Sequence, residues 1–163
     1  MNAKDALLSA LNMSRTVLTK YVSDLSDEDL MRRPHPGCNH LAWQLGHLIS
    51  SESSLVNMVY PGHGAELPPG FAEAHSRDAK DNDNPASFLT KQEYLELFAK
   101  VQEATAAAIQ SFPEDKLDDP APERMRSLFP TVGDFFMLAA THPLMHAGQF
   151  VPIRRELGKP VVI

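Results

Sequence analysis

The sequence predicts an all-α protein, a four-helix bundle with one long crossover connection. Three observations carry this prediction. Four long stretches place apolar residues three or four positions apart, which is the spacing of one helix face. No stretch shows the strict alternation that is typical of a strand. Between the second and third helical stretches, residues 61–87 lack any period and are rich in Pro, Gly and Asp.

The first helix is expected over residues 3–24, with Asn2 as its N-cap and Asp5 at the third helical position. The acidic stretch 26–29 then predicts a short helical turn over residues 27–32. Pro34 to Gly37 ends it. The apolar face of the first helix comprises Leu7, Leu8, Leu11, Val17, Leu18, Tyr21, Val22 and Leu25.

The second helix is expected from Asn39, a candidate N-cap, to Tyr60, with His47 near its middle. Residues 61–87 follow as an irregular connection. A connection of this length is uncommon and is usually functional or mobile. It is long enough to cross from one end of a bundle to the other, which would let the third helix run parallel to the second.

Thr90 and Glu93 form a predicted capping box at the start of a third helix that reaches Ser111. A second irregular connection, residues 113–130, precedes the fourth helix, which is capped around Thr131 and ends near Leu157. Pro143 lies inside this helix and is expected to kink it or open it locally, because proline removes a backbone donor.

The 163 residues fit one domain, 1–163, with enough chain to bury a core. The net charge of −6 is made of interspersed acidic and basic residues, which argues against a nucleic-acid partner. Cys38 is the only cysteine, so no intramolecular disulfide is possible, as suits a reducing compartment. No apolar run approaches the roughly 20 residues of a membrane span. We therefore expect a soluble, cytoplasmic protein without membrane contact.

The candidate site centres on His142 and His146, which are four residues apart and so project from one helix face. Two imidazoles at this spacing can bind one metal ion. A third ligand must come from elsewhere, and His47 on the second helix is the best candidate. Three histidines with open coordination positions are typical of a catalytic metal site. The alternative is that the histidines are hydrogen-bonded core residues, since such a pair arises easily by chance among seven histidines.

Four neighbours are candidates for orienting a ligand or lining a pocket. Gln44 precedes His47 by about one turn, and Gln149 follows His146 by about one turn. His40 and Trp43 lie seven and four residues before His47, on nearly the same face. As alternatives, the glutamines are ordinary surface residues, His40 is partly exposed and Trp43 belongs to the core. Four further residues are expected to be solvated: Glu52, Glu156, His63 and His75.

Taken together, three segments resemble the DinB-like superfamily of bacterial helical bundles, from roughly Leu8 to Gly158. They are Trp43-Gln44-Leu45-Gly46-His47-Leu48, His142-Pro143-Leu144-Met145-His146-Ala147-Gly148-Gln149, and Leu67-Pro68-Pro69-Gly70-Phe71 within the long connection. The resemblance implies a four-helix bundle with a crossover, often a homodimer. It also implies that His47, His142 and His146 bind a metal. Pro143 departs from the family, which often has an acidic or polar residue at that position.

Members of the DinB-like superfamily include metal-dependent thiol transferases, which use low-molecular-weight thiols, and a maleylpyruvate isomerase. The resemblance therefore favours an enzyme that activates a thiol or water on a divalent metal ion (Zn, Ni or Fe) for attack on a small molecule, as an S-transferase or a hydrolase does. The alternative is a non-catalytic bundle whose site binds metal or stays empty, and which acts through protein partners. An open metal position that faces a pocket would favour the enzyme.

Overall fold

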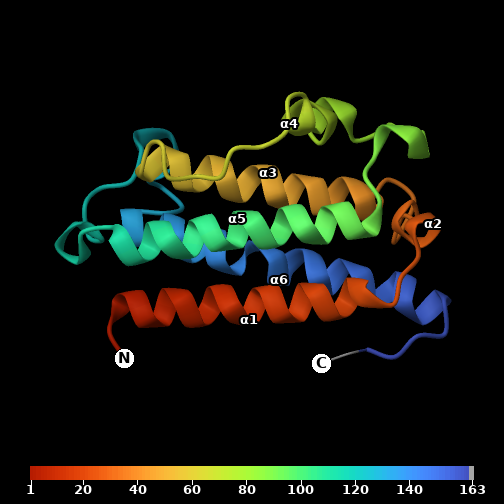
Figure 1. Ribbon diagram of the computed structural model, residues 1–163, viewed down its shortest axis with the longest axis horizontal. Coiled ribbons are helices and arrows are strands. Elements are labelled where there is room, and N and C mark those ends of the chain that lie inside the picture. Colours follow the sequence, from red (N-terminus) through yellow and green to blue (C-terminus); the bar gives the residue numbers. More distant parts are fainter. Residues whose placement is uncertain (162–163) are drawn as a thin grey trace.

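The structure of the protein is a computed structural model that describes residues 1–161, so the last two residues of the predicted domain lie outside it. Four long helices form the bundle (Figure 1): α1 (Ala3–Ser23), α3 (Leu41–Val59), α5 (Lys91–Ser111) and α6 (Val132–Glu156). A short helix, α2 (Asp27–Leu30), joins α1 to α3. Residues 1–161 contain no strand, only an isolated bridge between Pro120 and Thr131. The all-α prediction is confirmed.

The crossover determines how the helices pair. α3 and α5 run in the same direction, as do α1 and α6, because the chain between α3 and α5 returns along the length of the bundle (Figure 1). α6 packs against both α1 and α3, and α5 packs against the same two helices. This crossing segment is less irregular than we expected. It contains a short helix, α4 (Phe71–Ala74), and 3₁₀ turns at Arg77–Ala79 and Pro85–Ser87.

Side chains cap the helices largely as the sequence predicts. The side chains of Asn2, Thr90 and Thr131 each accept the backbone N–H of the third helical residue, whose carboxylate in turn accepts the backbone N–H of the cap residue. The exception is α3, whose N-cap is His40 rather than Asn39. The His40 ring accepts the backbone N–H of Trp43 at 3.0 Å. An imidazole nitrogen replaces the usual side-chain oxygen here.

The C-terminal helix remains helical across both of its prolines. α6 runs without interruption from Val132 to Glu156, with Pro143 and Pro152 inside it. The predicted local opening at Pro143 is therefore not present. No helix within residues 1–161 is both long enough and apolar enough to cross a bilayer.

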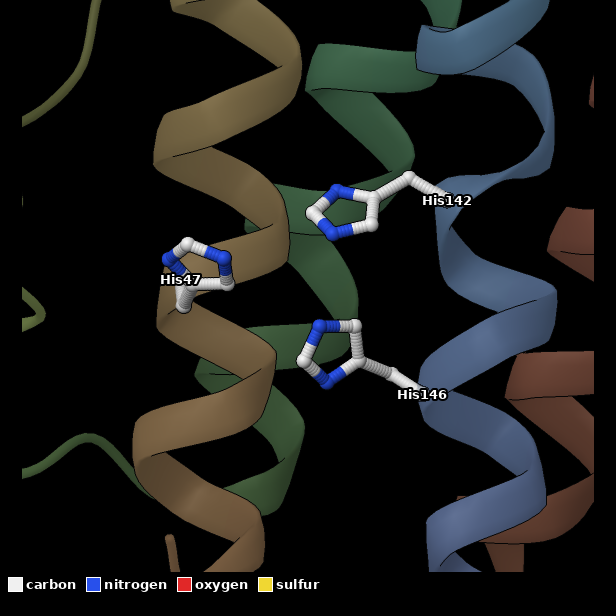
Figure 2. A group of neighbouring side chains, drawn as sticks. All are labelled: His47, His142 and His146. Atoms are coloured by element: carbon white, nitrogen blue, oxygen red, sulfur yellow. The ribbon is translucent and has the colours of Figure 1, made fainter.

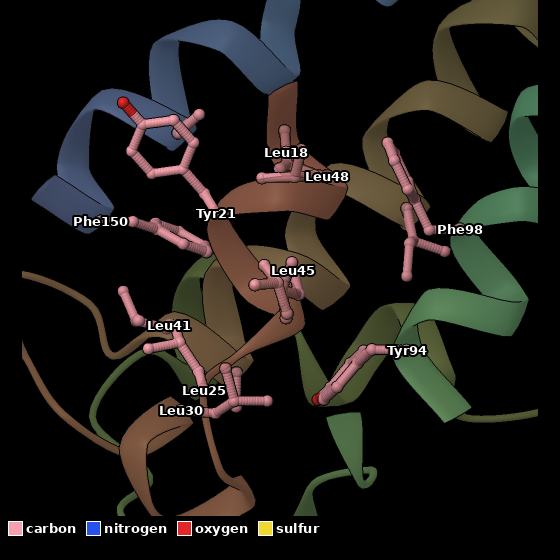
Figure 3. Packing of buried hydrophobic residues seen from close by; sticks show 14 of the residues in the cluster. Leu18, Tyr21, Leu25, Leu30, Leu41, Leu45, Leu48, Tyr94, Phe98 and Phe150 are labelled. Atoms are coloured by element: carbon pink, nitrogen blue, oxygen red, sulfur yellow. The ribbon is translucent and has the colours of Figure 1, made fainter. Parts of the chain in front are cut away.

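A polar layer divides the core. One apolar cluster, part of which Figure 3 shows, includes Leu18 of α1, Leu48 of α3 and Val101 of α5. A second cluster lies about two turns away on the same helices and includes Leu11, Val56 and Ala108. The core positions between the two clusters are polar and buried, and they comprise Ser14, Glu52, Gln102 and Thr105. We call these four residues the Glu52 layer.

Candidate metal centre

The three predicted histidines meet between α3 and α6. His142 and His146 project from α6, one turn apart, toward His47 on α3 (Figure 2). One ring nitrogen of each lies within 4.8 Å of the other two. The ring centroids are 5.5 Å apart for His47 and each partner, and 4.9 Å apart within the α6 pair. Nitrogen atoms at this separation can close around one ion, because zinc–imidazole bonds are about 2.0–2.1 Å long.

Burial keeps these imidazoles neutral. Desolvation lowers the pKa of His47 to about 4, with His142 and Arg77 adding repulsion. Desolvation also lowers the pKa of His146 to about 3, assisted by repulsion from its two neighbours, and lowers that of His142. A neutral imidazole keeps a lone pair on one nitrogen, which is the form that binds metal. The donor set therefore fits a divalent cation at neutral pH.

Gln44 fixes the orientation of His146. The Nδ1–H of His146 donates to Oε1 of Gln44 at 2.9 Å, so the lone pair lies on Nε2. The Gln44 amide is held in turn, because its Nε2 donates to the carbonyl oxygen of Asn39 at 2.8 Å. This is the partner that ligand histidines usually need to fix tautomer and ring angle. Gln44 is buried rather than solvated.

Trp43 supports the other side of the centre. Its ring stacks on His47, with centroids 4.9 Å apart and planes 7° apart. Its indole N–H donates to the carbonyl oxygen of Ser76 at 3.0 Å, which ties α3 to the crossing segment. The ring plane of His47 is therefore set by packing, and the long connection is part of the support.

A cavity of about 740 Å³ lies beside the histidine cluster. This volume is within the range of pockets that hold small molecules. His47 and His142 form part of the wall. Five residues with hydroxyl side chains also line it: Ser50, Ser51, Ser54, Ser76 and Thr141. The remainder is mostly apolar and comes from α3, α6, the crossing segment and the connection before α6.

His75 is a cavity residue that sequence reasoning missed. We expected it to be solvated, but it is buried, 2% exposed. Its Nδ1–H donates to the carbonyl oxygen of Phe71 at 2.8 Å, and its Nε2 accepts the Tyr94 hydroxyl at 2.7 Å. The ring occupies the space that a side chain at Gly46 would need, since a Cβ there would overlap it. A glycine in the middle of α3 was the available signal, because glycine inside a helix is costly without a packing reason.

Other candidate residues lie elsewhere. His40 is buried rather than partly exposed, and besides capping α3 it contacts the carbonyl oxygen of Asn82 at 3.0 Å. It does not line the cavity. Gln149 is exposed and does not line the cavity either. His63 and Glu156 are exposed as predicted, whereas Glu52 is buried, which corrects the prediction that it is solvated.

The sequence profile of the DinB superfamily matches residues 10–150, which is most of the chain. The chain belongs to the DinB superfamily. A crystal structure of a conserved protein from Enterococcus faecalis resembles this fold with a TM-score of 0.70 and 15% sequence identity, over 98% of this chain and 99% of that one. At this identity the likeness concerns the fold alone. No curated protein matches the chain.

Membership of the DinB superfamily confirms the resemblance drawn from the sequence motifs. Both histidine-bearing motifs lie inside the matched residues. DinB proteins are often metal-binding, and the histidine cluster here has the composition of such a site. The departure at Pro143 leaves the cluster assembled, because both histidines of α6 still face His47.

Proposed function

We propose that His47, His142 and His146 hold one divalent metal ion, Zn, Ni or Fe, and that this DinB protein is a metal-dependent enzyme. One observation carries the proposal. Three neutral ring nitrogens lie within 4.8 Å of one another, and two of the three residues, His47 and His142, line a cavity of about 740 Å³. No cysteine or carboxylate joins this group in the described chain. A three-histidine set beside a cavity has the composition of an open catalytic site rather than of a closed structural one.

The reaction class follows from the donor set and the cavity. A divalent metal in this position supplies Lewis acidity that lowers the pKa of a thiol or water. The chain itself contributes orientation through Gln44 and Trp43, and a mostly apolar wall beside the site. Within residues 1–161 no Asp or Glu lines the cavity, so the site offers no carboxylate as general base. We infer attack of a thiol or water on a small electrophile, as in an S-transferase or a hydrolase.

The hydrogen bonding of the triad also favours a site that binds metal over one that stays empty. In a bundle with an empty site, ring nitrogens of buried histidines would be satisfied by the backbone or by side chains. Here His146 has one side-chain partner and keeps its second nitrogen for the cluster. His47 has only Ser51 Oγ nearby, at 3.4 Å from Nδ1. These nitrogens remain available to a ligand.

The test is the metal content of tag-free protein, measured by elemental mass spectrometry and again after incubation with Zn, Ni and Fe. We expect close to one metal ion per chain, and its loss in His146→Ala. His35→Ala is the matched control, because His35 is exposed and outside the cluster. A protein that holds no metal before or after incubation contradicts the proposal. A metal-bearing protein is then screened with low-molecular-weight thiols and electrophiles.

A further inference from the structure

The cavity is lined by one basic side chain. Within the described chain, Arg77 is the only Lys or Arg that lines it, and no Asp or Glu does. Arg77 begins the 3₁₀ turn Arg77–Ala79 of the crossing segment, directly after Ser76, whose carbonyl holds Trp43. It lies near enough to His47 to oppose its protonation. None of the ion pairs in residues 1–161 involves Arg77.

Apart from Arg77, which is exposed, much of the lining is apolar and adaptable. Three of its side chains are methionines, whose unbranched, polarisable thioethers adjust to ligands of different shape. They are joined by one aromatic ring and two leucines. The six residues are Met58, Met125, Met145, Phe129, Leu55 and Leu138.

We infer that this cavity takes an apolar small molecule that carries one anionic group, and that Arg77 binds that group. The inference rests on the proposed function, in that it names the substrate class of the same site. A guanidinium forms paired hydrogen bonds with a carboxylate or a similar planar anion. An ammonium group would find no carboxylate in the cavity, and burying it unpaired is costly. A cationic compound is therefore expected to bind more weakly than an anionic compound of the same shape.

The test compares octanoate with its neutral analogue octan-1-ol and with octylammonium, by calorimetric titration of the full chain after chelation of metal. Chelation leaves Arg77 as the only charge that a ligand meets in the cavity. We expect octanoate to bind at least about tenfold more tightly than octan-1-ol, and octylammonium to bind most weakly. Arg77→Gln should weaken octanoate binding about tenfold and leave octan-1-ol binding unchanged.

Two further variants separate charge from shape. Arg155→Gln removes the same charge from an exposed position at the end of α6 and should change nothing. Leu138→Asn alters the apolar wall and should weaken both ligands while keeping their ratio. Equal binding of octanoate and octan-1-ol, an unaffected octanoate affinity in Arg77→Gln, or no binding of either ligand at millimolar concentration overturns the inference.

The failure of this inference is distinguishable from failure of the proposed function. The titration uses metal-free protein, so its result does not depend on metal uptake. Octanoate selectivity without metal binding would overturn the metalloenzyme and keep Arg77 as an anion-binding residue. Metal binding without octanoate selectivity would overturn the role of Arg77 and leave the proposed metalloenzyme standing.

Discussion

Two buried polar groups each include one residue of α3. In the histidine centre His47 meets the two histidines of α6 beside the cavity, whereas in the Glu52 layer Glu52 meets Gln102 of α5. Burial acts on both by disfavouring charge, with opposite effects on pKa. It lowers the pKa values of the histidines, and it raises the pKa of Glu52 to about 7 against hydrogen bonds from Thr105 and Gln102. Burial therefore favours the neutral form of both groups, the deprotonated form of the histidines and the protonated form of Glu52.

The difference lies in what each group lacks. At the histidine centre the unsatisfied atoms are ring nitrogens beside a cavity, so an external ligand can reach them. In the Glu52 layer the unsatisfied atoms are Oε1 of Glu52 and Oε1 of Gln102, and both are enclosed by the core of the described chain. Two acceptors without a donor need a proton, and a protonated Glu52 supplies it. The histidine centre can therefore accept an external ligand, whereas the Glu52 layer can hold a proton.

The largest expected effect comes from replacing the titratable carboxyl group of the Glu52 layer. The folded-state pKa of Glu52 is raised from 4.5 to about 7, so its stabilising proton is present below pH 4.5 and is lost as pH rises through 7. The glutamine in Glu52→Gln does not titrate, so this position no longer makes the stability depend on pH. We expect the stability of the wild type relative to the variant to fall by about 3 kcal/mol between pH 5 and pH 8.5. Urea unfolding followed by circular dichroism measures this difference.

The matched control for that experiment is Glu156→Gln, which neutralises an exposed glutamate near the end of α6. Its stability difference from the wild type should stay constant over the same pH range. A constant difference for Glu52→Gln as well would show that the Glu52 layer is charged or hydrated in the folded protein, and the contrast between the two regions would fail.

The next prediction compares Gln44 with Gln149, the two glutamines of the histidine motifs. Gln44→Leu removes the acceptor that holds Nδ1–H of His146, so the ring is no longer fixed for a ligand. We expect zinc affinity to fall by about 10–100-fold, measured by competition with a chelator. Gln149→Leu, at an exposed position on α6, should leave zinc affinity unchanged. Equal effects of the two variants would contradict the role given to Gln44.

The smallest expected effect concerns the tie between α3 and the crossing segment. Trp43→Phe keeps an aromatic ring beside His47 and loses the hydrogen bond to the Ser76 carbonyl. A cost of about 1 kcal/mol in unfolding free energy is expected. Octanoate affinity should fall as well, because Arg77 follows Ser76 directly. If stability falls while octanoate affinity stays the same, the crossing segment holds Arg77 without help from Trp43.

Local features of the sequence predicted most of the fold. Helical spacing and the capping boxes at Asn2, Thr90 and Thr131 are set within a few residues, so they are readable without tertiary contacts. The histidine motifs indicated the centre because the spacing of His142 and His146 constrains both rings. By contrast, the burial of His75 depends on Tyr94 and on the missing side chain at Gly46, which are far away in sequence.

The burial of Glu52 was likewise not predicted from the sequence. A glutamate on a helix is usually solvated, and only its helical register between Leu48 and Val56 placed it in the core. Its partner Gln102 lies 50 residues further along the chain. The cap of α3 also shifted by one residue, from Asn39 to His40, because the ring of His40 packs against Phe88 of the crossing segment. Such pairings arise from the fold and have no local signal.

The two halves of the candidate metal centre lie far apart along the chain, and this has a consequence for biosynthesis. Gln44 and the ring that it orients, His146, are separated by 102 positions, and the second half of the centre lies on α6. A nascent chain on the ribosome exposes His47 long before its partners emerge. The histidine cluster therefore cannot form from its first motif alone. Under the proposed function, metal capture is expected only once α6 has been made and has docked against α3.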